Sequence, residues 1–263
     1  MADAVAWTRE LGWRSIIVVS ELGRMLAFAG AICRRLLRPP LRLRRFAEEI
    51  FGLGVLSLVI VCVSGLAVGM VLGLQGYNTL VRFGAEGSLG AVVGLSLIRE
   101  LGPVLTALLV TGRAGSAAAA EIASMVLTEQ LDGLRMMSVD PIDLVIVPKA
   151  GAMVLVMPFL SALFILCGLG GAYLVGVGLM GLDPGIFVSS LRSSVRLADD
   201  VGGSLLKAVI FGCLTGLIAT FRGYFAAPTS AGVSAATTST VVTTSVAVLI
   251  GDYFVTALWG FQP

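Results

Sequence analysis

The sequence predicts an all-α membrane protein, and three observations support this fold class. Of the 263 residues, 57% are hydrophobic and only 13% are charged, about half the charged fraction of an ordinary soluble domain. Several uncharged runs exceed the roughly 20 apolar residues that a helix needs to cross a bilayer. These runs are continuous, whereas the strands of a membrane β-barrel alternate apolar and polar residues. We therefore expect membrane-spanning helices and exclude a soluble enzyme.

The first 45 residues are expected to lie on a membrane surface. They hold nine of the 18 basic residues, all arginine, and no uncharged run long enough to span a bilayer. On a helical wheel, five charged side chains fall within one arc: Asp3, Glu10, Arg14, Glu21 and Arg24. This arc predicts an interfacial amphipathic helix, followed by a basic elbow over 34–45 that suits anionic headgroups. A cleaved signal peptide is the competing interpretation, but the acidic start argues against it.

The rest of the chain, 46–263, is expected to form one domain of five membrane helices. Their expected ranges are 46–78, 87–112, 148–180, 201–224 and 233–259. A helix over 117–134 and a loop over 183–200 are expected on opposite sides of the membrane. With the N-terminus inside, 13 basic residues fall on the inner side and three on the outer side. The positive-inside rule therefore predicts a cytoplasmic N-terminus and a periplasmic C-terminus, an orientation that depends on the arginine-rich arm.

The first expected span carries a stripe of glycines. Gly65, Gly69 and Gly73 form two overlapping GxxxG motifs on one helix face, which lets another backbone approach closely. Glycine is common in this chain, with 33 residues, so a single GxxxG would carry little weight. Three glycines in register predict either a tight helix crossing or a dimer seam.

The second expected span carries two adjacent ions near its midpoint, Arg99 and Glu100. A charge at the centre of a membrane helix costs about 2.5 to 3.5 kcal/mol on insertion scales, so such residues face a protein interior or a wet cavity. Neighbouring residues on a helix point about 100° apart and do not face one another. We therefore expect both side chains to enter a polar space shared with other helices.

Several common chemistries are excluded by the residues present. The four cysteines, Cys33, Cys62, Cys167 and Cys213, form no CxxC motif, and histidine is absent, so we expect no metal site. The chain also has no GxxxxGK[ST] loop, because neither of its two lysines follows a glycine. Any nucleotide hydrolysis must then be done by another chain.

The segment 117–134 combines acidic and apolar residues at helical spacing. Glu121, Thr128, Glu129 and Asp132 recur every three to four residues beside Leu131 and other apolar positions. Such a helix could simply be solvated. It could equally be gripped in the groove of a soluble partner.

Three ordered blocks of sequence resemble the MlaE permease family. They are Arg99-Glu-Leu-Gly-Pro-Val-Leu-Thr-Ala-Leu, Gly112-Arg-Ala-Gly-Ser and Glu121-Ile-Ala-Ser-Met-Val-Leu-Thr-Glu-Gln-Leu-Asp132. Further short matches are Val139-Asp-Pro-Ile, Gly223-Tyr and Pro228-Thr-Ser-Ala-Gly. The likeness extends from about Phe51 to Trp259, and the Gly69 to Tyr77 run is most similar to the proteobacterial branch.

The resemblance implies the permease of an ABC transporter in the bacterial inner membrane. Family members form homodimers, each subunit with an interfacial helix and five membrane helices, driven by MlaF-type ATPases that bind the ATP and Mg. An MlaB-type STAS protein and a periplasmic MlaD-type MCE hexamer complete the assembly. The implied cargo is glycerophospholipid, moved between inner and outer membranes to maintain outer-membrane lipid asymmetry. The chain itself would be no enzyme, would hold no cofactor and would bind no nucleic acid.

The resemblance also implies two sets of site residues. The family's lipid pocket at the dimer interface maps to Leu72, Tyr77, Leu80, Phe83, Arg99, Glu100 and Lys207. Its ATPase-coupling helix maps to Glu121, Thr128, Glu129, Leu131 and Asp132. Many members have a basic residue where this chain has Val126, so a salt bridge from that position to the ATPase does not carry over.

Shared depth in the membrane leads us to hypothesise that Glu100 pairs with Lys207 and that the pair opens or closes with the nucleotide cycle. Asp252, close to Tyr253 and Trp259, is expected near the periplasmic surface. Two other functions stay open. A proton-coupled secondary transporter could use Glu100, Lys207 and Asp252 as a relay, although no repeated half with broken helices is visible. A non-transporting scaffold for the ATPase would have no need of buried ions.

Overall fold

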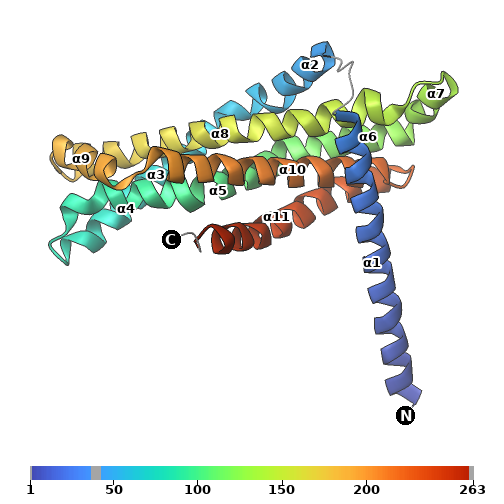
Figure 1. The fold of residues 1–263 in the computed structure, drawn as a ribbon, viewed down its shortest axis with the longest axis horizontal. Helices are drawn as coiled ribbons and strands as arrows, with labels where there is room; N and C mark the ends of the chain where they lie inside the picture. The colour runs from blue at the N-terminus through green and yellow to red at the C-terminus, as the bar shows by residue number, and fades with distance from the viewer. Residues whose placement is uncertain (1, 37–42, 261–263) are drawn as a thin grey trace.

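The computed structural model describes residues 2–36 and 43–260, and every regular element in those ranges is a helix. Within these described ranges, five helical stretches are long and apolar enough to cross a membrane, which confirms the predicted number. They are Arg44–Val81, Glu86–Leu127, Ile142–Leu179, Ala198–Tyr224 and Ser230–Leu258. In Figure 1 their long helices run side by side, and α1 (Ala2–Leu36) crosses them at one end.

Most stretches contain several consecutive elements. The first contains α2 (Leu43–Leu53), η1 (Val55–Ser57) and α3 (Leu58–Val81). The second contains η2 (Glu86–Ser88), α4 (Leu89–Ser96), η3 (Leu97–Leu101), α5 (Gly102–Val110), η4 (Thr111–Gly115) and α6 (Ser116–Leu127). The third contains η5 (Ile142–Ile146), α8 (Val147–Tyr173) and η6 (Leu174–Leu179). The fourth contains η7 (Leu197–Val201) and α10 (Gly202–Tyr224), and the fifth is α11 (Ser230–Gly260). Elements η3 to η7 are π-helical turns.

Helix α1 lies across the direction of the bundle, close to α7 (Gln130–Met136), as Figure 1 shows. We call this the α7 end and the opposite one, with α9 (Pro184–Ser194), the α9 end. The second half of α1 is anchored by an ion pair of 2.7 Å between Glu21 and Arg222 and by Phe28, which is 5% exposed. This orientation agrees with an interfacial helix. Half of the predicted basic elbow, at 37–42, lies outside the described residues.

Two predictions about the connecting segments are wrong. The segment 117–134 is not one helix, because Glu129 adopts a left-handed backbone with φ of 56° between α6 and α7. The segment 183–200 is largely helical instead of a loop. Asp183 caps α9 by accepting a hydrogen bond of 3.0 Å from the Ile186 backbone N–H, and Pro184 suits the first helical turn.

The glycine stripe of α3 packs against α8 of the same chain. A Cβ added at Gly69 would lie 1.8 Å from the carbonyl oxygen of Gly168, and one at Gly73 would lie 3.1 Å from Ala172 Cα. In a bilayer, helices associate through such close contacts, because lipid is as apolar as their side chains. These contacts make the stripe a helix crossing within the subunit.

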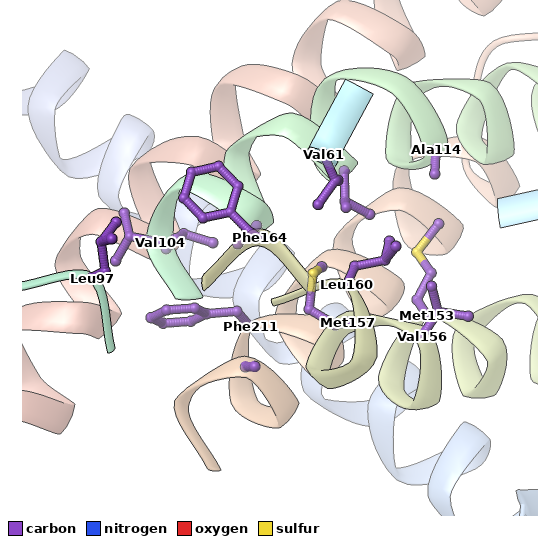
Figure 2. Packing of buried hydrophobic residues seen from close by; sticks show 14 of the residues in the cluster. Val61, Leu97, Val104, Ala114, Met153, Val156, Met157, Leu160, Phe164 and Phe211 are labelled. Carbon is purple, nitrogen blue, oxygen red and sulfur yellow. The ribbon is translucent and has the colours of Figure 1, made fainter. Parts of the chain in front are cut away.

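The main apolar core lies between α8 and its neighbours. Phe164 and Met157 of α8 and Phe211 of α10 are fully buried, and Figure 2 shows these side chains close to Leu160 and Val104. A second apolar cluster at the α7 end includes Phe28, Ile122, Leu131 and Phe221. The bundle is therefore packed firmly at its centre and again where α1, α6 and α10 meet.

Candidate functional site

Four residues from three helical stretches meet inside the bundle, and we call them the ionic cluster: Glu100, Lys207, Asp252 and Thr256. Lys207 Nζ donates hydrogen bonds to Glu100 Oε2 at 2.8 Å and to Asp252 Oδ1 at 3.1 Å. It also donates to Thr256 Oγ1 at 2.7 Å. The predicted pairing of Glu100 with Lys207 is therefore present. Asp252, which is expected from the sequence near the periplasmic surface, also joins this cluster through a buried lysine, and its depth in the membrane stays a prediction.

The backbone beside Glu100 gives Lys207 a further acceptor. Pro103 has no N–H, so the carbonyl of Arg99, four residues earlier, lacks its usual helical partner. Here the chain forms the π-helical turn η3, a wider turn that is common at functional sites. Lys207 Nζ donates to the Arg99 carbonyl oxygen at 2.9 Å. The Glu-Leu-Gly-Pro run thus creates an acceptor for a lysine from α10.

Burial differs within the ionic cluster. The side chain of Lys207 is 7% exposed, that of Asp252 21% and that of Glu100 42%. A lysine this buried is stable as a cation only when it is paired and hydrogen-bonded. The ammonium of Lys207 contacts two carboxylates, and Glu100 is the more exposed of the two.

A second ion pair lies next to the ionic cluster. Arg99 Nε donates to Asp200 Oδ1 at 2.8 Å, and the other oxygen of Asp200 accepts a hydrogen bond of 2.7 Å from the Arg196 backbone N–H. Asp200 is 4% exposed at its side chain, whereas Arg99 is 54% exposed. Asp200 therefore fixes one edge of the guanidinium, and the exposed remainder is suited to an external anion such as a phosphate.

The structure joins only some of the predicted lipid-site residues. Within the described residues, polar contacts bring Arg99, Glu100 and Lys207 together. The apolar members lie on or beside α3: Leu72, Tyr77 and Leu80 are half-buried against the main core, and Phe83 is 79% exposed. Helix α3 packs mainly along α8, whereas the ionic cluster joins η3, α10 and α11. A shared pocket that includes both groups stays a prediction.

The predicted coupling residues fall into two groups. Leu131 is 4% exposed in the second apolar cluster, and the Glu121 carboxylate contacts Lys149 Nζ at 2.7 Å, so both are used within the chain. Thr128, Glu129 and Asp132 are exposed around the break between α6 and α7. We call the segment 127–137 the tip. It also exposes Met136 and Met137, at 89% and 66%, which the sequence did not single out.

Lys149 centres another ionic group, which joins α2, α6 and α8. Its Nζ lies 2.8 Å and 2.9 Å from the two carboxylate oxygens of Glu49, in addition to its contact with Glu121. The side chain of Lys149 is only 3% exposed, so this lysine is buried among the helices. Its contacts tie the start of the first stretch to the helix that leads to the tip.

Sequence reasoning missed Asp200 and Thr256, and it named Asp252 only as a member of a possible proton relay. Asp252 interrupts an apolar run, which is the same signal that drew attention to Glu100. Asp200 stands just before an apolar stretch and resembles an ordinary flanking charge. Thr256 gives no sequence signal, because threonine is common in membrane helices and its role depends on the approach of α11 to α10.

These features define a class: a multi-pass helical membrane protein with an ionic centre between its helices and a helical tip projecting from one end. The chain belongs to the MlaE permease family, whose model, "Permease MlaE", matches residues 46–258. The matched region includes all five membrane-length stretches except the first two residues of the first.

Named relatives share most of the chain. A Haemophilus influenzae protein named "Intermembrane phospholipid transport system permease protein MlaE" is 53% identical over 80% of this chain and 81% of its own length. A Rickettsia felis "Probable ABC transporter permease protein" is 38% identical over 95% of this chain and 96% of its own. The Arabidopsis thaliana chloroplastic protein TRIGALACTOSYLDIACYLGLYCEROL 1 is 32% identical over 88% and 66%, respectively.

Proposed function

We propose that this chain is the permease subunit of an ATP-driven transporter that moves glycerophospholipid between the inner and outer membranes and maintains outer-membrane lipid asymmetry. The observation that carries the proposal is the half-exposed pair of ions, Arg99 and Glu100, fixed by Asp200 and Lys207 inside a membrane bundle. The name of the Haemophilus influenzae relative, an intermembrane phospholipid transport system permease protein, supports the same cargo.

The proposed lipid site is completed by a second copy of the chain. Glu100 and Arg99 remain accessible in one subunit. Helix α11 is also poorly covered, because only 11% of its most apolar segment is buried, whereas 61% of the corresponding segment of the fourth stretch is buried. A homodimer would cover α11 and place the α3 residues near an ionic cluster. In this arrangement the guanidinium of Arg99 binds the lipid phosphate, and apolar side chains contact the acyl chains.

ATP hydrolysis is assigned to a partner. The tip is the proposed contact with an MlaF-type ATPase, which holds the ATP and Mg, while this chain catalyses no reaction. An MlaB-type protein and an MlaD-type hexamer are the further proposed partners. The proposed location is the bacterial inner membrane, with the N-terminus and the tip in the cytoplasm and the C-terminus in the periplasm. The nine arginines of the first 45 residues support this orientation.

Mass spectrometry of phospholipid that co-purifies with the assembled complex tests the function. Arg99→Ala removes the phosphate donor, so we expect the bound lipid to fall by about tenfold or more, as for the loss of a charge-assisted hydrogen bond. Arg192→Ala is the matched control, because Arg192 is an exposed arginine on α9. Equal phospholipid in Arg99→Ala and in the parent complex would contradict the proposed site.

One observation favours a second candidate, a proton-coupled transporter. Asp252, Glu100 and Thr256 form a hydrogen-bonded set around Lys207 that resembles a proton relay. Lipid transport in that case would stop on addition of an uncoupler and continue without ATP. The ATP-driven transporter shows the reverse pattern.

A further inference from the structure

The α7 end contains a cluster of aromatic rings that joins α1 to the end of α10. Phe28 of α1 lies with its ring centroid 5.8 Å from Phe221 and 5.6 Å from Tyr224. Phe225 completes the cluster at 4.9 Å from Phe221 and 5.1 Å from Tyr224. The tilted and edge-to-face geometries are those that aromatic pairs prefer. The last turn of α10 is therefore held in one position.

An arginine from the tip contacts this aromatic cluster. Arg135 Nη2 donates a hydrogen bond of 2.5 Å to the hydroxyl of Tyr224, and its guanidinium lies 5.8 Å from the centre of the same ring. Arg135 Nη1 also donates to Asp132 of α7. The Tyr224 hydroxyl and the Asp132 carboxylate raise the pKa of Arg135 above its ordinary value, so the donor stays charged.

Helix α7 has few other anchors. Its seven residues stand between two non-glycine residues with left-handed backbones, Glu129 with φ of 56° and Ser138 with φ of 58°. Leu131, which is 4% exposed, is its buried apolar residue. Leu134, which is half-buried, packs against the same cluster, so the direction of α7 relative to the bundle depends on these two leucines and on the contact between Arg135 and Tyr224.

Helix α10 connects that contact to the ionic cluster. Tyr224 and Lys207 lie on the same α-helix, about 25 Å apart at 1.5 Å per residue. The second stretch also leads from the tip to Glu100, but two π-helical turns, η3 and η4, interrupt it. α10 is regular over its 23 residues, so it is the stiffer of the two connections.

We propose that the Arg135–Tyr224 contact couples displacement of the tip to α10 and thereby to the position of Lys207 against Glu100. Arg135 and Tyr224 are positioning residues, since neither touches lipid or nucleotide in this scheme. The proposal rests on the proposed function, in which the ATPase acts on the tip. Without this contact, displacement of the tip would reach α10 only through the packing of α6 on α10, where Gly223 approaches Ala119, and ATP would be hydrolysed with less lipid movement.

The test uses the complete transporter, with its ATPase, reconstituted in proteoliposomes. Phospholipid moved and ATP hydrolysed are measured together for Tyr224→Phe, which removes one hydroxyl and keeps the ring. We expect lipid moved per ATP to fall about threefold to tenfold, the range for one hydrogen bond. Tyr173→Phe is the matched control, because Tyr173 also packs edge-to-face on a phenylalanine, Phe187, at the opposite end of the bundle. Its ratio should equal that of the parent.

A double variant tests whether the two residues act through one contact. Arg135→Met combined with Tyr224→Phe should lower the ratio no further than the worse single change, and additive defects would overturn the shared contact. A Tyr224→Phe variant that moves as much lipid per ATP as the parent would also overturn the inference. This outcome includes a variant in which misfolding lowers lipid transport and ATP hydrolysis in the same proportion. A parent complex that moves no phospholipid with ATP would instead reject the proposed function.

Discussion

Two buried lysines of this protein have the same charge environment but different backbones around them. Lys149, near the α7 end, and Lys207, in the ionic cluster, have side chains that are 3% and 7% exposed, and each contacts two carboxylates. The partners of Lys149 come from regular α-helices. Lys207 contacts the π-helical turn η3 and takes the carbonyl that Pro103 leaves free.

From this difference we infer that the Lys149 group is structural and that the Lys207 group is functional. Lys149 of α8 forms ion pairs with Glu49 of α2 and Glu121 of α6, and these pairs link the three helices. Lys207 lies beside Arg99, a second cation whose side chain is 54% exposed. An anion outside the subunit can therefore compete for the ions around Lys207. The number of contacting carboxylates does not distinguish the two groups, whereas the π-helical backbone and the exposed second cation, Arg99, beside Lys207 do.

Lys207→Met should have the largest effect on transport. The change leaves Glu100 and Asp252 facing each other without a cation, so we expect ATP-driven lipid transport to fall at least about tenfold, as for the loss of a charged hydrogen-bonding partner. Transport by reconstituted complex is the measurement. The triple variant Glu100→Gln, Asp252→Asn, Lys207→Met removes the charge imbalance and should regain thermal stability without regaining transport. Normal transport in either variant would remove the distinction between the two lysines.

Lys149→Met should act mainly on stability. Removing one partner of a buried ion pair costs about 3 to 5 kcal/mol, and the lower figure applies here because Glu121 is half exposed. The thermal unfolding midpoint in detergent measures the change. Adding Glu49→Gln and Glu121→Gln should restore most of the loss. If Lys149→Met instead leaves the midpoint unchanged and abolishes transport, the two lysines have the same role.

Gly69→Ala tests packing without any change of charge and should have the smallest effect. The added Cβ would lie 1.8 Å from the Gly168 carbonyl oxygen, so α3 and α8 must separate, at a cost of about 1 to 3 kcal/mol. Gly170→Ala is the control, since a Cβ there meets nothing within 4 Å. If Gly170→Ala were as unstable as Gly69→Ala, the close approach of the α3 and α8 backbones would not be the cause of the lost stability.

The sequence predicted those features that depend on local composition. Continuous apolar runs located the five spans, and two charges at similar depth, Glu100 and Lys207, predicted a pair. The break at Glu129 was missed because its neighbours are good helix formers and a left-handed glutamate has no sequence signal. The contact between Glu121 and Lys149 depends on how α6 packs beside α8, which periodicity does not give.

The central claim is that the ions beside Lys207 hold a phospholipid between two subunits. Its most direct test is an experimental structure of the assembled complex with lipid bound. We predict phosphate oxygens about 3 Å from the Arg99 guanidinium, the distance of a charge-assisted hydrogen bond. A structure in which Arg99 and Glu100 are packed against protein, with the phospholipid bound elsewhere, would contradict the claim.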